Sequence, residues 1–315
     1  NAIMSVPSGG SIANIQVDEV LSVEDLLKSL LICSGNDAAN VLAEHIGGSI
    51  ESFATMMNTR ASELGAKNTN FVNANGLHDE NHYSSAYDLA LFAKYAMDNF
   101  PKFREIVSTI RFRLPATEKY PTDDRFFTNS NQLIVPNQST GSKNYYYQYS
   151  TGIKTGFTTP AKNCLVASAE KDGISLICVI LGAGQNDNGV SYRYTDAIEL
   201  FNYGFEQLKA LTIVQEKTFV DKITVKDAPK NEDTVRLVTE KDLSLTINRD
   251  DEFTDFPTTV TLKEDISAPI AKGDVLGTIT YHIYDEDYVI NLLADNDVEK
   301  KSDIILKLLK GIRDI

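Results

Sequence analysis

The sequence predicts an α+β protein in which helices and an antiparallel hairpin come first and a β-rich region follows. In about the first hundred residues, apolar side chains recur with the spacing of amphipathic helices. Near the middle of the chain, two apolar runs flank Asp172-Gly173, a dipeptide that favours a β-hairpin turn. Beyond about Lys209, short alternating segments separated by polar turns indicate strands. We therefore expect two domains, residues 1–209 and 210–315, because 315 residues exceed the usual size of one.

The first hundred residues contain four expected helices. The first begins after Ser22, a good N-cap residue that Asp25 follows three positions later. Glycines at 47–48 and at 65 end the second and the third helix. The four helices are expected at about 23–31, 38–46, 50–64 and 85–96.

The rest of the chain combines loops, a hairpin, one helix and a series of strands. Between residues 101 and 150, prolines, asparagines and Tyr145-Tyr146-Tyr147 predict loops with short strands. Strands are then expected at 152–157, 163–169 and 174–181, and a helix at 192–208. The second domain should contain strands at 222–225, 234–238, 243–247, 258–262 and 276–284.

Charge and cysteine content exclude several classes of function. The chain carries 30 Lys and Arg residues against 44 Asp and Glu residues, so it repels phosphate backbones and we expect no nucleic-acid partner. The three cysteines form no C-x-x-C motif and do not cluster with the four histidines, so we expect no metal site. Cys164 and Cys178 lie on the two arms of the expected hairpin, where they either approach each other or remain buried thiols.

The last thirteen residues, 303–315, have the pattern of a short amphipathic helix. Lysines and an arginine surround its apolar face, which contains Ile305, Leu308, Leu309 and Ile312. Such a helix either lies on a membrane surface, or leads to an anchor, or packs against its own protein. No run of about 18 apolar residues, the length needed to span a bilayer, occurs in the sequence.

Two short motifs carry the functional information. Ser34-Gly35-Asn36 lies between two expected helices, and Lys154-Thr155-Gly156 lies on a short strand before the apolar hairpin. Alone, the first is typical of a helix–helix turn and the second of an edge strand. Their order and spacing match the second and third motifs of penicillin-recognising serine acyl-transferases, whose full set is S-x-x-K, S-[DG]-N and K-[TS]-G.

Longer stretches around these motifs carry a family resemblance. They are SVEDLLKSLLICSGNDAANVLAE (22–44), TNFVNANGL (69–77), HYS (82–84), TGIKTGFTTPAKNCLVASA (151–169), the region around Arg193 and APIAKGDVLGTITY (268–281). The chain resembles the low-molecular-weight penicillin-binding proteins, serine-type D-alanyl-D-alanine carboxypeptidases of the peptidase S11 type, over almost its whole length. Ala161-Lys162-Asn163 departs from the usual Ala-Gly of the family. The resemblance implies a β-lactamase/transpeptidase-like domain of helices plus antiparallel sheet, followed by a small β-rich domain.

Five residues of the two motifs have side chains or backbones suited to a role in the reaction that the resemblance implies. Ser34 can relay a proton, and Asn36 offers an amide donor and a carbonyl acceptor to the substrate peptide bond. Lys154 suits the terminal carboxylate of D-Ala-D-Ala and assists Ser34 electrostatically, and Thr155 adds a hydroxyl donor to that carboxylate. Gly156 lets the ligand lie beside the strand in the manner of an added strand.

A sixth candidate is Arg193, at the start of the last helix of the first domain. It aligns with a basic residue that binds the terminal carboxylate in the family, and a guanidinium can hold a carboxylate by two hydrogen bonds. The alternative is an ordinary surface residue at a helix start. The sequence leaves both interpretations open.

The S-x-x-K motif of the family is not found where the resemblance requires it. It should open a helix several tens of residues before Ser34, which is ahead of position 1. The only match, Ser168-Ala169-Glu170-Lys171, lies on an expected strand and its turn, where Ser and Lys cannot stand one helical turn apart. We therefore expect this chain alone to be inactive, with the nucleophile supplied by a longer protein or by a separate N-terminal chain.

The resemblance implies a reaction and a location. The parent enzyme would remove the terminal D-Ala of a peptidoglycan pentapeptide through an acyl-enzyme, without a cofactor, and β-lactam antibiotics would acylate its serine. It would act on the cell-wall side of the bacterial cytoplasmic membrane, attached through its C-terminal tail. Two other interpretations stay open: a protein that binds wall peptides or β-lactams without cleaving them, and a β-lactamase, against which the appended β-rich domain argues.

Overall fold

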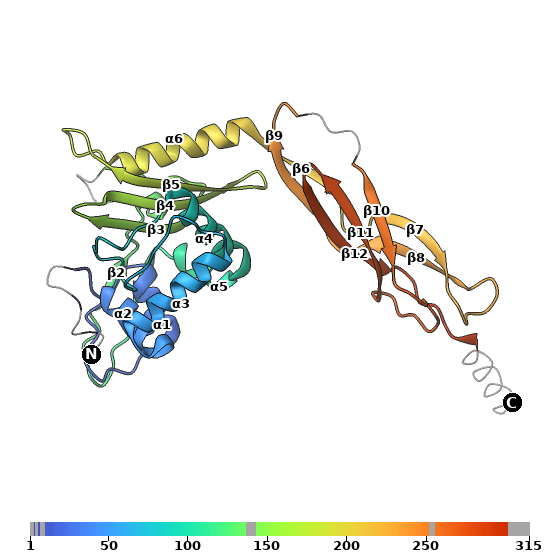
Figure 1. Cartoon of the computed structure of the whole chain (residues 1–315), viewed down its shortest axis with the longest axis horizontal. Coiled ribbons are helices and arrows are strands. Elements are labelled where there is room, and N and C mark those ends of the chain that lie inside the picture. Colours follow the sequence, from blue (N-terminus) through green and yellow to red (C-terminus); the bar gives the residue numbers. More distant parts are fainter. Residues whose placement is uncertain (1–2, 4–5, 7–9, 137–142, 252–255, 302–315) are drawn as a thin grey trace. The chain divides into compact units, whose positions relative to one another are not determined.

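The computed structural model describes residues 3, 6, 10–136, 143–251 and 256–301 (Figure 1). The chain divides into two compact units, Asn1–Glu206 and Gln207–Ile315, and each is described by itself. The first unit combines helices with antiparallel sheets and the second is β-rich, which confirms the predicted fold class. The expected helix at 303–315 lies outside the described residues.

The four helices expected in the first hundred residues are all present. They begin where short polar side chains cap their exposed N–H groups: Ser22 Oγ accepts a hydrogen bond from the Asp25 N–H at 3.0 Å. The second helix ends at Gly48, whose φ of 77° lies in the left-handed region that favours glycine. Their bounds are α1 (Val23–Leu31), α2 (Asn36–Gly47), α3 (Ile50–Glu63) and α4 (Ala86–Asn99).

The loop expected at residues 101–150 contains a helix, so that prediction was wrong in part. The helix α5 (Pro101–Val107) has its proline in the first turn, where the missing N–H would have no partner in any case. Pro101 therefore starts a helix, although prolines are also typical of loops. The remaining short elements are β1 (Arg111–Arg113), β2 (Phe126–Thr128) and a 3-10 helix, η2 (Gln132–Ile134).

A three-stranded antiparallel sheet follows, in the order β3 (Ser150–Thr158), β4 (Lys162–Lys171) and β5 (Ile174–Ala183). The turn between β4 and β5 is the predicted Asp-Gly turn, with positive φ at Asp172 (52°) and Gly173 (77°). Among the described residues, β3 pairs only with β4, so its other edge is open. This edge carries the Lys154-Thr155-Gly156 motif.

Helices cover both faces of this sheet (Figure 1). On one face, Ile177 of β5 joins an apolar cluster with Met97 of α4 and Val107 of α5. The neighbouring Leu176 faces the other way, as strand alternation requires, and meets α6 (Tyr192–Gln207). Leu176 and α6 are packed closely: a Cβ atom added to Gly204 of α6 would lie only 2.6 Å from Leu176 Cδ1, so there is no room for a side chain at Gly204. The sheet is thus held between α4 and α5 on one side and α6 on the other.

The described part of the second unit consists mainly of strands and the turns between them. Its five-stranded sheet has the order β10-β11-β12-β8-β7, and β6 pairs separately with β9. Two of these strands, β6 and β12, were not predicted; β12 begins at Glu286-Asp287, which resembles a polar turn. Large apolar side chains such as Leu237, Ile290 and Leu292 fill the core. The bounds are β6 (Leu208–Val214), β7 (Phe219–Thr224), β8 (Thr234–Thr239), β9 (Leu243–Asn248), β10 (Thr258–Leu262), β11 (Val275–Ile283) and β12 (Glu286–Ala294).

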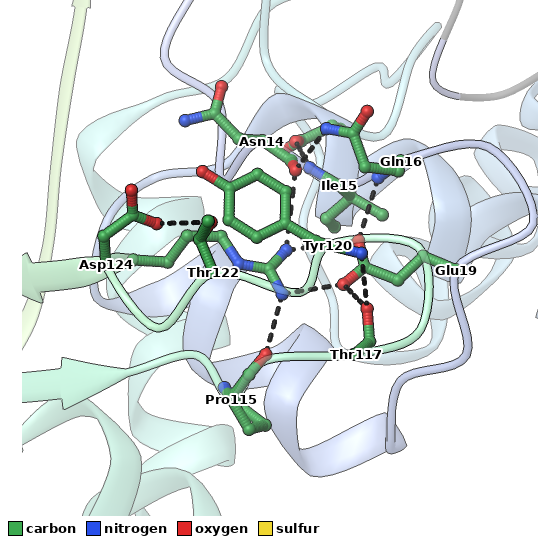
Figure 2. A network of polar contacts seen from close by, with 11 residues as sticks. Asn14, Ile15, Gln16, Glu19, Pro115, Thr117, Tyr120, Thr122 and Asp124 are labelled. Carbon is green, nitrogen blue, oxygen red and sulfur yellow. Dashed lines mark hydrogen bonds and ion pairs between the residues drawn. The ribbon is translucent and has the colours of Figure 1, made fainter.

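A buried ion pair fastens the segment before α1 to the β1–β2 hairpin (Figure 2). The side chains of Arg125 and Glu19 are 1% and 0% exposed, and two hydrogen bonds of 2.7 and 3.1 Å join them. Glu19 also accepts hydrogen bonds from Thr117 Oγ1 and from the Gln16 N–H. Burial by itself raises the pKa of Glu19, but the hydrogen bonds outweigh it and hold that pKa below its ordinary value of 4.5.

A second buried carboxylate ties the same segment to the start of α2. Asp37 is 2% exposed, and its oxygens accept hydrogen bonds from the N–H groups of Ala13, Ile15 and Ala38 at 2.9–3.1 Å. The segment 11–19 is therefore fixed at both ends, by Asp37 and by Arg125. It forms one wall beside the Ser34-Gly35-Asn36 turn.

Glu19→Gln should destabilise the first unit by about 3–5 kcal/mol at pH 7, because it leaves the Arg125 guanidinium buried without a counter-charge. Urea unfolding of the first unit measures this. Since the folded-state pKa of Glu19 is lowered, its contribution is present above pH 4.5 and is lost as the pH falls through the lower value. The difference between the two proteins should therefore shrink in acid.

Glu105→Gln is the matched control for Glu19→Gln. It removes an equivalent carboxylate from an exposed pair with Lys102, whose two side chains are 57% and 53% exposed. Such pairs contribute roughly 0–1 kcal/mol. Equal effects of the two substitutions at pH 7 would contradict a structural role for the buried pair.

Candidate active site

The Ser34-Gly35-Asn36 motif forms the turn between α1 and α2. Ser34 has a φ of 65°, in the left-handed region, and the Gly35 N–H donates to the Ser29 carbonyl oxygen at 3.0 Å. A Cβ on Gly35 would lie 2.9 Å from Asp37 Oδ1 and 3.2 Å from the Ser29 oxygen, so the close packing requires glycine here. The turn presents the Ser34 side chain outside both helices.

Lys154 of β3 reaches this turn from 120 residues away in the chain. Its Nζ donates hydrogen bonds to Ser34 Oγ at 2.8 Å and to the Thr155 carbonyl oxygen at 2.9 Å. The pKa of Lys154 is lowered from its ordinary value of 10.5 to about 8. Burial is the largest cause, interaction with Cys33 opposes the shift, and the positive charge of Arg193 contributes to it. The two motifs predicted to share a cleft are therefore in direct contact.

Thr155 makes a contact that the sequence analysis missed. Its Oγ1 donates to Ser130 Oγ at 2.7 Å. Ser130 lies between β2 and η2, in an Asn-Ser-Asn stretch that looks like any polar loop, and nothing in the sequence marks it as part of a site. The structure thus adds a hydroxyl group to the motif residues.

Arg193, in the first turn of α6, approaches the same strand edge. Its Nη1 is 3.5 Å from the Gly156 carbonyl oxygen, and its guanidinium lies over the Tyr194 ring at 4.7 Å. Its Nε is buried and has no hydrogen-bond partner among the described residues. Gly156 itself is exposed on the open edge of β3. A guanidinium group with an unused donor therefore stands beside a free strand edge.

Asn36, the last residue of the first motif, has part of its hydrogen-bonding capacity used within the protein. It is 8% exposed, and both its backbone N–H and its Nδ2 donate to the Ser11 carbonyl oxygen, each at 2.9 Å. One amide donor is thus committed to holding the segment 11–19 rather than offered to a ligand. The other N–H of Nδ2 and the acceptor Oδ1 are not used by these bonds.

The described residues contain neither a cluster of metal-ligating side chains nor a disulfide. No group of three or more His, Cys, Asp and Glu side chains within the described ranges could hold a metal ion. All three cysteines are free, and on the hairpin Cys178 pairs with Ala167 while Cys164 pairs with Gly156, so the two thiols are not opposite each other. Burial, followed by the charge of Asp37, raises the pKa of Cys33 to about 11. No described helix is both long enough and apolar enough to cross a membrane.

Two family descriptions match the chain, one for each unit. Residues 2–185 match the D-alanyl-D-alanine carboxypeptidase family, peptidase S11, and residues 209–300 match the C-terminal domain of penicillin-binding protein 5. The chain is 33% identical over 297 residues to the D-alanyl-D-alanine carboxypeptidase DacF of Bacillus subtilis, which covers 94% of this chain and 70% of DacF. It is 32% identical to DacC of Escherichia coli, and there it covers 87% of this chain and 63% of DacC.

Solved structures agree with the sequence matches. The crystal structure of a peptidoglycan synthesis regulatory factor, PBP3 of Streptococcus pneumoniae, superposes with a TM-score of 0.76 at 26% identity, covering 95% of this chain and 83% of PBP3. Penicillin-binding protein 5 of Haemophilus influenzae gives a TM-score of 0.58 at 28% identity, covering 93% of this chain and 79% of that one. The resemblance stated from the motifs is confirmed, and the chain belongs to the peptidase S11 family of D-alanyl-D-alanine carboxypeptidases.

Proposed function

We propose that this chain provides the substrate-recognition side of a serine-type D-alanyl-D-alanine carboxypeptidase that trims peptidoglycan stem peptides. The observation that carries the proposal is the 2.8 Å hydrogen bond from Lys154 Nζ to Ser34 Oγ. It joins a cation that suits a carboxylate to a hydroxyl that can pass a proton, within one cleft. An ordinary helix–helix turn and an ordinary edge strand would have no reason to meet in this way.

The terminal carboxylate of the peptide is proposed to bind at the edge of β3. Lys154 and Arg193 supply positive charge there, and Thr155 supplies a hydroxyl donor. The open edge beside Gly156 offers backbone groups with which an extended peptide can pair as an additional strand. Together these contacts would fix the last peptide bond near Ser34, with Asn36 Oδ1 accepting from a donor in the cleft.

The nucleophile is proposed to come from outside residues 1–315. The only S-x-x-K sequence among them starts at Ser168, which is 3% exposed on β4 and hydrogen-bonded to Thr151 Oγ1 at 2.7 Å. A buried hydroxyl on a central strand cannot attack a substrate. The chain on its own would therefore be inactive, and residues of the S-x-x-K type, in a longer protein or in a separate chain, would complete the site.

In the completed site, the chemistry is acyl transfer in two steps. The serine oxygen attacks the carbonyl carbon of the penultimate D-Ala, the C–N bond breaks, and the terminal D-Ala leaves with a proton on its amine. Ser34, held by Lys154, is placed to relay that proton. Water then hydrolyses the ester and restores the serine. A β-lactam would acylate the same serine.

The family also supports a location outside the cytoplasmic membrane, where peptidoglycan is built. Attachment through the tail at 303–315 is a further proposal that rests on the sequence pattern alone. The absence of a usable S-x-x-K from these residues favours one second candidate, a protein that binds wall peptides without cleaving them. A fluorescent penicillin separates the two: covalent labelling of the complete gene product supports the enzyme, and reversible peptide binding without labelling supports the binder.

Lys154→Ala, in the protein that carries the S-x-x-K residues, should lower kcat/KM for a D-Ala-D-Ala peptide by at least about a hundredfold, as is typical of removing one electrostatic stabiliser. Steady-state release of D-Ala measures the change. An unaltered rate constant in a folded variant would refute the role proposed for Lys154 as a carboxylate holder.

The affinity of this chain for N-acetyl-D-Ala-D-Ala should fall as the pH rises through about 8. Below the pKa of Lys154, about 8, its Nζ carries a positive charge, and above it that charge is lost. Calorimetric titration across this range measures the affinity. Lys154→Arg is the control, because a guanidinium stays charged and should flatten the profile. A profile that is equally steep in the arginine variant would assign the pH dependence to another group.

A further inference from the structure

Ser130 is a point at which three parts of the first unit converge. Its N–H donates to the carbonyl oxygen of Ile32, two residues before Ser34. Its carbonyl oxygen accepts from Tyr194 Oη at 3.1 Å, next to Arg193 on α6. Its Oγ accepts from Thr155 Oγ1 at 2.7 Å. The residue therefore touches the turn, the helix and the strand that carry the proposed site, although it belongs to none of the family motifs.

The backbone around Ser130 is held rigidly. Asn129 and Asn131 on either side are 4% and 0% exposed. Asn129 Nδ2 donates to the Thr109 carbonyl oxygen at 3.0 Å, and Asn129 Oδ1 accepts from the Asn131 N–H at 2.9 Å. This buried, hydrogen-bonded frame fixes the backbone on both sides of Ser130, whose hydroxyl is hydrogen-bonded to Thr155 Oγ1.

Thr155 needs such a partner to act on a carboxylate. In the present structure its hydroxyl proton is directed to Ser130. When a carboxylate approaches, the Thr155 hydroxyl can turn its proton to the ligand, and the Ser130 hydroxyl can then donate to Thr155 Oγ1, because each hydroxyl is both donor and acceptor. Hydrogen bonds in such a chain polarise and strengthen one another.

We propose that Ser130 is a positioning residue for the terminal carboxylate, acting through Thr155 rather than by touching the substrate. This inference rests on the proposed function of the same cleft. Without the Ser130 hydroxyl, Thr155 loses the group that fixes its orientation and supports its donation. Removing the Ser130 hydroxyl should therefore lower the affinity only of ligands that have a terminal carboxylate for Thr155 to bind.

The test compares two probes, N-acetyl-D-Ala-D-Ala and its C-terminal amide, whose affinities for the 315-residue chain are measured by NMR titration. Ser130→Ala should weaken binding of the acid about three- to tenfold, the range expected for one hydrogen bond. Affinity for the amide should hardly change. Ser130→Thr keeps the hydroxyl and should restore binding of the acid. In a Thr155→Ala background, Ser130→Ala should have no further effect.

Ser108→Ala is the matched control, because the exposed Ser108 hydroxyl, at the end of α5, donates to the Glu105 carbonyl oxygen and to no other group of the described residues. It should leave both affinities unaltered. If the unsubstituted chain binds the acid no better than the amide, the proposed carboxylate cleft is wrong and the inference falls with it. Two other outcomes would contradict the inference alone, in a chain that does prefer the acid. One is that the Ser130→Ala variant keeps the full preference for the acid; the other is that the effects of Ser130→Ala and Thr155→Ala on affinity for the acid are fully additive.

Discussion

The hydrogen bond from Lys154 Nζ to Ser34 Oγ is the contact on which the arrangement of the first unit depends. This bond requires that the edge of β3 lie against the turn between α1 and α2. Several other contacts hold the neighbouring elements in place. Asp37 joins the start of α2 to the segment 11–19, and Arg125 joins that segment to the β1–β2 hairpin. The helices α4 and α5 pack against one face of the sheet. These contacts join the elements that flank the turn and the sheet, and Lys154 itself contacts Ser34 of the turn.

Burying Lys154 has an electrostatic cost. Among the described residues its ammonium group has no carboxylate partner, and burial is the main reason that its pKa is about 8. Arg193 adds a second positive charge to the same region. Two neighbouring positive charges without a carboxylate partner are the electrostatic reason for proposing that this region binds the negatively charged end of a peptide.

The sequence predicted that Ser34 and Lys154 lie close together, because each belongs to a short motif of the family and the two motifs are expected to share one site. They did not predict Ser130 or Ser11, since each acts through a contact that forms only when distant segments pack together. Ser11 contributes only a backbone carbonyl, which can come from any residue type. In the same way, α5 was missed because Pro101 either ends or starts a helix depending on its neighbours, and β12 because its first residues are charged. Local pattern determined the elements; tertiary packing determined which polar atoms remain available to a ligand.

The central claim is that Lys154, Thr155 and Arg193 together bind the terminal carboxylate of a D-Ala-D-Ala peptide. A crystal structure of this chain with N-acetyl-D-Ala-D-Ala tests it most directly. The account predicts the carboxylate within hydrogen-bond distance of Thr155 Oγ1 and beside Arg193, with the peptide lying along the edge of β3. A peptide bound elsewhere, or the opposite end of the peptide at these residues, would contradict it.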